Sequence, residues 1–468
     1  MDDDSTANRI ELHLRSLVRA ASTGQRLPST RSLVEQFSVS AITVQRAVQR
    51  LVQEGLVITR PGTGNFVAAR RAMSRPDFSW QTTTLGPSRN NPSAISAAMT
   101  QTTPGIIPLH SGYPSEDLLP IALVRSALAR ASRGAAVTDR PAMEGLPELR
   151  AWFASEVAAS PGSPGAAPSA DDVIIVPGSQ SALASIFRAL AQPGDSIVME
   201  SPTYWGAIAA ARQAGLVIVP IARGAGAPSA DALDAALVTS GARLFYAQPN
   251  FANPTGAIWS RAESDAILGV IRSRDAFVIE DDWAHDFGID EVARPLVAHD
   301  ADGHVVYIRS LTKSLSSAVR VGAIIARGPA LARIQVDRTV TDLYVSGTLQ
   351  AAALEVMTSP GWRAHARRLQ SALRERRDTL ARAVVAELGA ETLTALPRGG
   401  INLWLRFDDR VDVADLARRS LAAGVAIAPG TDWFPTEPPG AYARLNYSGP
   451  RPDRFGEAIH ILAELLGR

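Results

Sequence analysis

Lys313 is the only lysine in this 468-residue chain, in which the other 46 basic residues are arginines. Arginine replaces lysine in most roles, such as surface ion pairs and phosphate contacts. It does not replace a lysine that must lose its proton and attack a carbonyl carbon, because a guanidinium stays protonated. We therefore expect Lys313 to carry carbonyl chemistry. The alternative is a surface lysine that persists by chance. Which interpretation holds depends on whether the other residues that such chemistry requires are also present.

Two polar groups with matching chemistry follow segments that are typical of β-strands. The segment 173–176 runs into the tetrapeptide PGSQ, which contains Ser179 and Gln180 and opens a helical segment. Backbone N–H groups and the helix dipole favour a dianion there, although an ordinary strand–helix turn has the same pattern. Asp281 ends another strand-like segment. A carboxylate buried at that point requires a partner, and a protonated ring nitrogen is suitable.

Three further side chains complete the set, each with a plainer alternative. Tyr204 lies in the sequence SPTYWG and can stack on an aromatic ring or fill the core. Asn253 starts the tetrapeptide NPTG after a strand-like segment, where its amide can donate to a phenolate or simply form a turn. Arg444 lies in a strand-like segment near the C-terminus. Its planar guanidinium can clamp a carboxylate bidentately or form an ordinary salt bridge.

The residues beside Lys313 indicate which group this set serves. Ser310 and Thr312 precede the lysine, and Arg320 follows it, where it can make a charge-assisted contact with a phosphate. Pyridoxal phosphate (PLP) requires an amine, a phosphate cup, a carboxylate at its pyridine nitrogen and a donor at its phenolate. We therefore predict that the chain binds PLP and that Lys313 is the attachment site.

The elements that position these residues alternate between apolar strand-like segments and amphipathic helical ones. Strands are expected at 173–176, 196–200, 216–219, 243–248, 277–281, 305–309 and 321–326. Strands separated by helices predict a mainly parallel sheet covered on both faces, with ligands at the carboxyl ends of the strands. After about residue 345 a long arginine-rich helical stretch precedes short strands, which predicts a smaller α+β domain. These short strands are expected at 402–406, 425–428 and 444–447.

The first 70 residues show a different pattern, that of a small helical module with a hairpin. Residues 8–21 carry apolar side chains at helical spacing, and Ser29 and Ser40 are good N-caps for two more helices. Two strand-like segments follow on either side of a PGTG turn. Three helices and a hairpin predict a winged helix-turn-helix domain in residues 1–70.

The third helix of this module, 41–54, is the one expected to enter the major groove of DNA, with Thr43, Gln45 and Arg46 facing bases or backbone. Residues 5–75 contain 11 arginines and three acidic residues, a balance of +8, whereas the whole chain carries +1. A basic module joined to a mildly acidic body favours nucleic-acid binding. A solvated basic face is the alternative.

The segment 27–67 resembles the GntR family of transcription factors in its turn, caps, helix spacing and glycine hairpin. The resemblance implies contacts with double-stranded DNA from Arg31, from the start of the third helix and from Gly62. Many relatives carry an arginine where this chain has Ala41, so their base preference does not carry over. The following segment, 71–105, is rich in Ser, Thr, Pro, Asn and Gln, which predicts a linker.

From about residue 106 to the end, the order of motifs resembles the fold-type I aminotransferases. The resemblance places the PLP Schiff base on Lys313, the pyridine nitrogen at Asp281, the phenolate at Asn253 and the substrate carboxylate at Arg444. It implies that Tyr204 stacks on the ring. It also assigns a set of residues to the phosphate: Ser179, Gln180, Ser310 and Arg320, with Thr312 in the same segment.

Two positions depart from that pattern. Aminotransferases carry a tyrosine just after the pyridine aspartate, where this chain has Trp283 and Ala284. They often lend a further tyrosine to the partner subunit's phosphate, where this chain has Arg140. A tryptophan cannot donate a phenolic hydrogen bond to the cofactor. Both departures therefore argue against efficient transamination more than against PLP binding.

The whole chain resembles the MocR subfamily of GntR regulators, which join a winged helix to a PLP-binding, aminotransferase-like effector domain and form head-to-tail, domain-swapped homodimers. The effector domain is expected at 106–468, with a large part at about 120–345 and a small part at about 346–468. We expect a regulator that senses an amino acid or another amine by aldimine exchange at Lys313. The alternative is an active aminotransferase with an accessory DNA-binding module.

Several other classes of protein are excluded by composition. The chain has no cysteine, which excludes disulfides, thiolate nucleophiles and cysteine-ligated zinc, and we expect no metal site. A Walker A loop is excluded because its lysine is missing. The acidic start is no signal peptide, and no run of about 18 apolar residues suggests a membrane span, so we expect a cytoplasmic protein.

Overall fold

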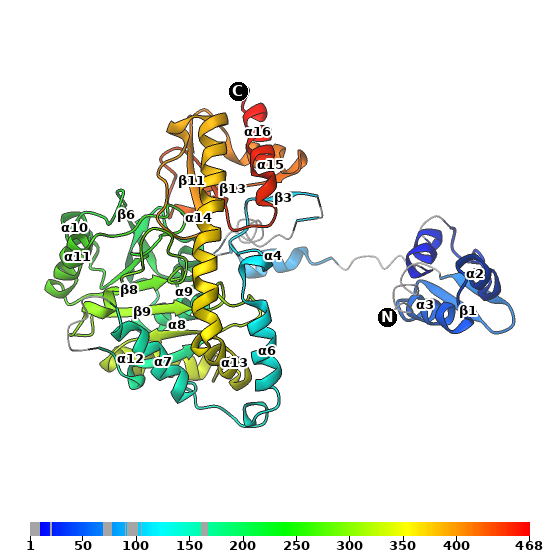
Figure 1. Cartoon of the computed structure of the whole chain (residues 1–468), viewed down its shortest axis with the longest axis horizontal. Helices are drawn as coiled ribbons and strands as arrows, with labels where there is room; N and C mark the ends of the chain where they lie inside the picture. The colour runs from blue at the N-terminus through cyan, green and yellow to red at the C-terminus, as the bar shows by residue number, and fades with distance from the viewer. Residues whose placement is uncertain are drawn as a thin grey trace. The chain divides into compact units, whose positions relative to one another are not determined.

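The computed structural model describes residues 10–18, 21–68, 77–88, 90, 102–103, 105–160 and 167–468. The chain divides into two compact units, Met1–Pro87 and Ser88–Arg468 (Figure 1). Part of the expected linker, 71–105, lies outside the described residues. Among the described helices none is long and apolar enough to cross a membrane.

The first unit is a winged helix-turn-helix, as predicted. Residues 10–18 are helical and are followed by α2 (Thr30–Phe37) and α3 (Ala41–Gln53). The wing is the antiparallel hairpin of β1 (Val57–Arg60) and β2 (Gly64–Val67). These elements share one apolar core, formed by Ile10, Leu14, Leu27, Leu33, Val44, Ala47, Val48, Leu51, Val57 and Val67.

Local chemistry explains where the two helices of the turn begin. The side-chain oxygen of Ser29 accepts a hydrogen bond from the backbone N–H of Ser32 (3.1 Å) at the start of α2. Ser40 accepts one from the N–H of Thr43 (3.2 Å) at the start of α3. Each cap satisfies a donor that has no partner within its helix.

One short helix lies inside the segment that was expected to be a linker. This helix, α4 (Ser79–Leu85), has no buried residue. It starts where the Asp77 carboxylate accepts a hydrogen bond from the N–H of Ser79 (2.9 Å). This short helix was not expected from the sequence, because the segment has no apolar periodicity. The linker over 71–105 stays a prediction.

The second unit is built on a seven-stranded sheet with strand order β4-β10-β9-β8-β7-β5-β6. Its strands match the seven segments expected from the sequence: β4 (Val173–Val176), β5 (Ser196–Ser201), β6 (Val217–Ala222), β7 (Leu244–Ala247), β8 (Phe277–Asp282), β9 (Val305–Ser310) and β10 (Gly322–Ile325). The pairs from β6 through β9 are parallel, whereas β10 runs antiparallel to both of its neighbours. A parallel pair would need a crossover helix between β9 and β10, and the described segment between them contains none. β10 therefore pairs with β9 in the antiparallel direction.

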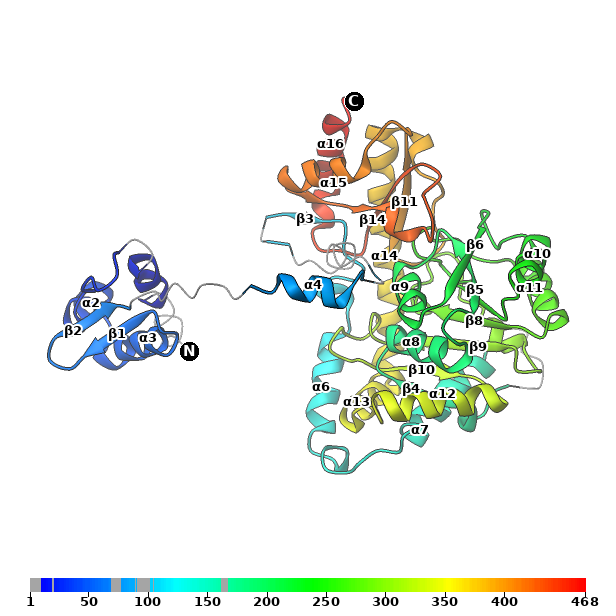
Figure 2. The same cartoon turned by 180° about the vertical axis from the view of Figure 1, so that it is seen from behind.

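Helices cover both faces of this sheet (Figures 1 and 2). One apolar core joins a face of the sheet to α8 (Ser179–Leu190), α9 (Trp205–Ala214) and α12 (Gly328–Thr341). The core on the other face contains residues of six helices: α6 (Ile121–Ala131), α7 (Pro147–Ala158), α10 (Ala230–Ser240), α11 (Arg261–Ser273), α13 (Gly347–Thr358) and the start of α14 (Pro360–Leu388). Because successive strand residues alternate between the two cores, the sheet is buried on both sides and its polar side chains gather at the strand ends.

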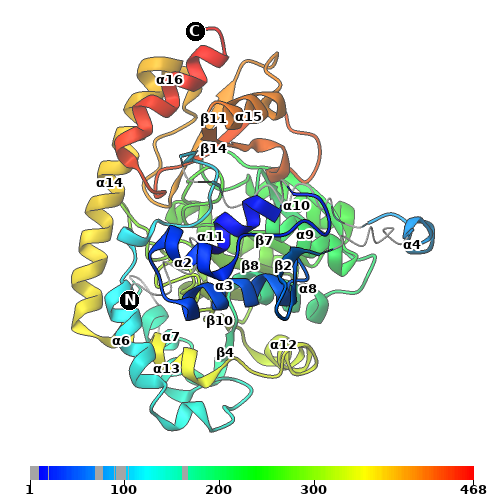
Figure 3. The same cartoon turned by 90° about the vertical axis from the view of Figure 1, so that its right-hand side faces the viewer.

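The smaller part begins with α14 (Pro360–Leu388), which lies beside α16 (Phe455–Leu465) in Figure 3. Its sheet has the order β11-β14-β13, with β11 (Asn402–Phe407), β13 (Ala428–Pro429) and β14 (Ala441–Asn446), and α15 (Val413–Ala422) packs nearby. The strand expected at 425–428 is split in two. Its first half, β12 (Val425–Ala426), pairs instead with β3 (Ile107–Pro108) from the start of this unit. Short 3-10 helices complete the fold: Glu116–Leu118, Ala135–Val137, Ala170–Asp172, Leu296–His299, Ala390–Thr392, Gly430–Trp433 and Pro452–Arg454.

Candidate cofactor and DNA sites

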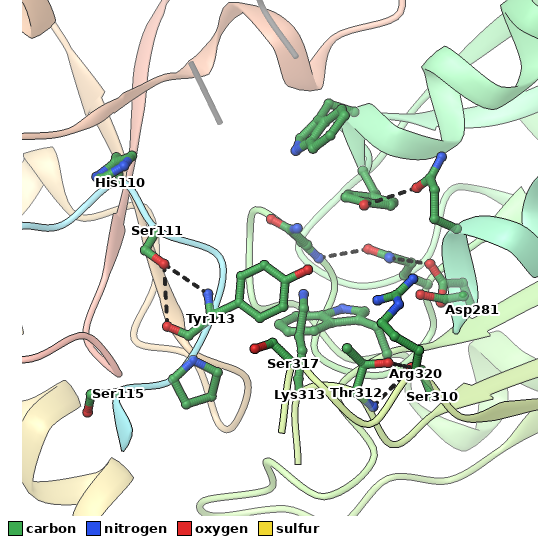
Figure 4. A pocket seen from close by; sticks show the side chains of 18 of the residues that line it. His110, Ser111, Tyr113, Ser115, Asp281, Ser310, Thr312, Lys313, Ser317 and Arg320 are labelled. Atoms are coloured by element: carbon green, nitrogen blue, oxygen red, sulfur yellow. Dashed lines mark hydrogen bonds between the residues drawn. The ribbon is translucent and has the colours of Figure 1, made fainter. Parts of the chain in front are cut away.

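A cavity of about 1040 Å³ opens at the carboxyl ends of the parallel strands (Figure 4). All nine residues expected from the sequence to surround PLP line it: Ser179, Gln180, Tyr204, Asn253, Asp281, Ser310, Thr312, Lys313 and Arg320. Most lie at the end of a parallel strand or shortly after it, Ser179 and Gln180 open α8 after β4, and Arg320 lies just before β10, so the sheet brings residues from distant parts of the chain to one edge.

Lys313 follows β9 and reaches into this cavity between two aromatic rings. Its Nζ atom lies 4.1 Å from the ring centroid of Trp283 and 5.8 Å from that of Tyr113, and Figure 4 shows the Tyr113 ring beside it. Burial, together with the positive charge of Arg444, lowers the pKa of Lys313 to about 7, although the charge of Asp281 opposes the shift. A large share of the amine is therefore neutral near neutral pH, which is the form that attacks a carbonyl.

Only one of the two carboxylate oxygens of Asp281 has a hydrogen-bond partner among the described residues. Its Oδ2 atom accepts hydrogen bonds from the hydroxyl of Tyr246 (2.8 Å) and from Nε2 of Gln248 (2.9 Å). Its Oδ1 atom is buried without a partner among the described residues. Burial raises the pKa of Asp281, although the two donors and Lys313 oppose this. A buried acceptor without a donor is costly, so a protonated ring nitrogen fits this position.

The opposite end of the cavity is suited to an anion. Gly178, with φ +94°, precedes α8, whose first backbone N–H groups have no partner within the helix. A Cβ atom at Gly178 would lie 3.0 Å from Nη2 of Arg320 and 3.2 Å from Oγ1 of Thr312, so these groups enclose a small cup. Ser310 holds Thr312 through a hydrogen bond between their hydroxyls (3.1 Å). Within the described part of the chain no carboxylate pairs with Arg320, which leaves its charge for a phosphate.

The side chain of Gln180 is already engaged by neighbouring protein groups. Its Nε2 atom donates to the carbonyl of Gly206 (2.8 Å), and its Oε1 atom accepts from the hydroxyl of Tyr204 (3.1 Å). The amide therefore fixes Tyr204, and only the backbone N–H of Gln180 remains for an anion. Burial raises the pKa of Tyr204, and the charge of Asp281 adds to this, so the phenol stays protonated.

Arg444 is not among the residues that line the cavity, and neutral oxygens hold its guanidinium. Its Nη2 atom donates to the backbone carbonyls of His110 (2.6 Å) and Ser111 (3.2 Å), and its Nη1 atom donates to Oδ1 of Asn253 (3.3 Å). These partners are neutral, so Arg444 forms no ordinary salt bridge in the described structure. Burial lowers its pKa to about 10. Trp433 also donates to Oδ1 of Asn253 (3.1 Å), which leaves the amide nitrogen of Asn253 as its donor.

Sequence reasoning missed three residues of this site. Tyr246 and Gln248 support Asp281 from the end of β7, and their spacing of two residues, which puts both on one face of a strand, was a usable signal. Tyr113 lies in the sequence SGYP, a glycine–proline turn far from any of the other motifs. Nothing local indicated that this turn would reach Lys313.

The two departures from the aminotransferase pattern have different surroundings. Trp283 is buried, stacks with Phe287 at 6.4 Å and lies against Lys313, and its indole nitrogen has no partner among the described residues. It supplies an apolar wall where a phenol was expected. Arg140 is exposed after a 3-10 helix.

The residues expected to meet DNA separate into an exposed set and one buried residue. Gln45 and Arg46 are exposed on α3, Gly62 is exposed in the wing, and the Arg31 side chain is 91% exposed. Thr43 is only 3% exposed, and its hydroxyl shares a hydrogen bond with that of Ser40 (2.8 Å). The Thr43 side chain therefore helps to close the start of the helix, and its contact with DNA stays a prediction.

Two family models match the chain, and they cover its two parts. Residues 6–67 match the bacterial regulatory proteins of the gntR family. Residues 104–460 match aminotransferase class I and II, which is most of the chain. The chain belongs to the aminotransferase class I and II family. This family membership implies PLP as the cofactor, and the gntR-type module implies DNA binding.

Curated relatives of this aminotransferase-family protein include both regulators and enzymes. An uncharacterised HTH-type transcriptional regulator of Bacillus subtilis, YdfD, is 27% identical and is matched over 95% of this chain and 92% of its own. The probable rhizopine catabolism regulatory protein MocR of Rhizobium meliloti is 28% identical and is matched over 93% of this chain and 88% of its own. A 2-aminoadipate transaminase of Thermus thermophilus is 27% identical over 78% and 90%.

Solved structures confirm the fold of the larger unit. LysN, an α-aminoadipate aminotransferase of Thermus thermophilus, has a TM-score of 0.71 and 26% identity, covering 81% of this chain and 97% of its own. An archaeal alanine:glyoxylate aminotransferase has a TM-score of 0.74 at 24% identity, covering 82% and 98%. The predicted aminotransferase-like fold and the predicted relationship to MocR are therefore both confirmed.

Proposed function

We propose that this protein is a transcriptional regulator that holds PLP at Lys313 and changes its DNA binding when an amine occupies the cavity. The observation that carries the proposal is the presence, on one chain, of an exposed helix-turn-helix surface and a cavity in which all nine expected cofactor residues meet. The relatives support it, because YdfD and MocR are named as regulators and match more than nine tenths of the chain. The transaminase match covers less of it.

The residues around the cavity fit PLP, which supplies an aldehyde that combines reversibly with amines when it is bound. We assign the attachment to the Lys313 amine, whose lowered pKa favours the neutral nucleophile. The unpartnered Oδ1 atom of Asp281 would accept a hydrogen bond from the protonated pyridine nitrogen, and the amide nitrogen of Asn253 would donate one to the phenolate. The phosphate would bind at the cup formed by the start of α8, Thr312 and Arg320.

The effector is proposed to be an amine that also carries a carboxylate. Arg444 is buried and cationic, and its present partners are three neutral oxygens. A carboxylate is a stronger acceptor for a guanidinium than a carbonyl oxygen is. An effector carboxylate would therefore replace the carbonyls of His110 and Ser111, and would release the turn that holds Tyr113 against Lys313.

That release offers a route from the cavity to the rest of the chain. The turn at 110–113 follows β3, which pairs with β12 of the smaller part, and it precedes α6 of the larger part. A change in this segment would therefore act on both the larger and the smaller part of this unit. Ligand binding then shifts the population of arrangements that bind DNA.

A homodimer is part of the same proposal. Apolar side chains on the outer side of α12 and just after it are exposed, and a second copy of the chain is the proposed partner for them: Val336 (66%), Val340 (84%), Leu343 (54%) and Tyr344 (36%). Covering such a patch removes apolar area from water. Sedimentation of the full chain tests this part directly.

The function itself is tested with the full-length holoprotein and the DNA upstream of its own reading frame. We expect α-amino acids to perturb the cofactor absorbance and to change DNA affinity in the same concentration range, with no sustained release of keto acid. The corresponding carboxylates without an amine serve as controls and should change neither. Rapid multiple turnover with no effect on DNA affinity would instead support the aminotransferase alternative.

A further inference from the structure

One apolar side chain lies on the side of α3 that faces away from the module's core. Ile42 is 65% exposed. The buried residues of the helix, Val44, Ala47, Val48 and Leu51, form the opposite side. Ile42 shares its side with Gln45 and Arg46, which lie three and four residues further on and are exposed. This is the spacing of neighbours on a helix surface, so the three side chains form one continuous stripe.

Its position sets Ile42 apart from an ordinary exposed aliphatic residue. It occupies the second position of α3, immediately after the Ser40 cap and Ala41. In helix-turn-helix proteins the N-terminal residues of this helix are the ones that approach the base edges. A single exposed isoleucine needs no explanation elsewhere on a surface, but here it lies where a DNA-binding side chain would be.

The major groove offers one apolar group that distinguishes a base, which is the 5-methyl of thymine. Isoleucine has no donor or acceptor, so it cannot read a hydrogen-bonding edge. Its branched side chain is stiff at χ1 and therefore presents its methyl groups in a fixed direction. Ala41 beside it is small and leaves room for the groove wall.

We propose that Ile42 is a specificity-determining residue that contacts the 5-methyl group of one thymine in each half-site of the operator. The inference rests on the proposed DNA-binding function and adds the kind of base that the first turn of α3 selects. The occupant is duplex DNA because the surface belongs to the gntR-type module and because Ile42 lies beside the exposed Arg46.

The test begins with an operator selected from random duplexes by the full-length protein. Each thymine of that operator is then replaced singly by deoxyuridine, which lacks only the 5-methyl group. We expect one position in each half-site at which this replacement weakens binding roughly fourfold, since burial of one methyl group corresponds to a factor of about that size. The Ile42→Ala variant should bind the parent operator more weakly and lose sensitivity to deoxyuridine at that position.

Leu12 provides a matched control in the same module. It is 67% exposed but lies in the helix at residues 10–18, outside the helix-turn-helix surface. Leu12→Ala should keep the full sensitivity to deoxyuridine. Thermal unfolding of Ile42→Ala, which should match that of the parent protein, checks that any loss is not caused by a disturbed helix.

The inference is overturned if no thymine shows methyl sensitivity, or if Ile42→Ala retains the sensitivity of the parent protein. Failure to select any duplex would be a different result, because it would refute DNA binding itself and the inference with it.

Discussion

The two proposed binding regions of this protein are constructed in opposite ways. The DNA-facing residues lie between Arg31 and Gly62, on adjacent elements, and their side chains are exposed. The cofactor residues extend from Ser179 to Arg320, with Arg444 behind them, and most are buried at the edge of one sheet. In the first region, solvent is expected to screen the charges of these exposed side chains from one another. In the second, each group depends on the charges and donors of its neighbours, as the pKa values of Lys313 and Asp281 indicate.

The largest effect is expected from Lys313→Ala. Removal of the amine should abolish the absorbance of the lysine-linked cofactor and the response to amines, while cooperative unfolding is retained. Lys313→Arg is the matched control for charge, and it should fail equally because a guanidinium is no nucleophile. Absorbance spectra and thermal unfolding measure both results. An unchanged absorbance band in either variant would refute the assignment of Lys313.

Asp281→Asn should weaken PLP binding strongly without unfolding the protein. The amide can still accept hydrogen bonds from Tyr246 and Gln248, but it carries no charge for the pyridine nitrogen. A hydrogen bond to a charged group contributes about 1.5–3 kcal/mol, which corresponds to a loss of affinity of roughly 10- to 150-fold. Equilibrium dialysis with PLP measures it. Equal affinities for the parent and the variant would show that Oδ1 has another role.

The pH dependence of cofactor capture tests whether burial activates the lysine. The pKa of Lys313 is lowered to about 7, so the reactive neutral form grows as pH rises through this value. The rate at which apoprotein reacts with PLP should therefore increase about tenfold between pH 6 and pH 8 and then level off. Stopped-flow absorbance measures the rate. A free lysine derivative is the control, and its rate should keep rising well above pH 8. A protein profile like that of the free amine would contradict the shift.

Arg31→Ala should produce the smallest effect and leave the cofactor site untouched. The side chain is 91% exposed and pairs with Glu35 at 3.3 Å, so its loss should change the free energy of unfolding by less than about 0.5 kcal/mol. Loss of one phosphate contact should reduce the slope of log binding constant against log salt concentration by about one. Arg410→Ala, which removes a side chain that is 90% exposed in the other unit, is the matched control. If the parent protein, Arg31→Ala and Arg410→Ala showed the same salt dependence of DNA binding, Arg31 would not contact DNA.

Taken together, these variants show whether the contrast between the regions holds. If the comparison is right, changes at the cavity abolish or strongly weaken cofactor binding, whereas single changes on the winged helix lower DNA affinity by small amounts. An Arg31 variant that altered PLP binding, or an Asp281 variant that altered DNA affinity in the absence of any amine, would show that the two regions are coupled in the resting protein.

Most features that depend on near neighbours were predicted from the sequence alone, although the short helix α4 was not. The seven strands of the sheet were predicted because apolar runs between turns need only local context, and the caps at Ser29 and Ser40 were predicted for the same reason. The single lysine and the motifs around it led to the nine residues of the cavity, since each motif follows a strand end and a parallel sheet brings such ends together.

Only the tertiary structure decided which partners these residues have. Arg444 is held by the carbonyls of His110 and Ser111, which lie 334 and 333 residues earlier in the chain, and no local pattern encodes such a contact. Gln180 is committed to Tyr204 and Gly206, and Thr43 is turned inward to Ser40, because packing and hydrogen-bond satisfaction choose the direction of a side chain after its residue type has been fixed. The sequence therefore specified which reactive and hydrogen-bonding side chains this protein has. The fold determined which of these side chains are held by protein partners and which can bind a ligand.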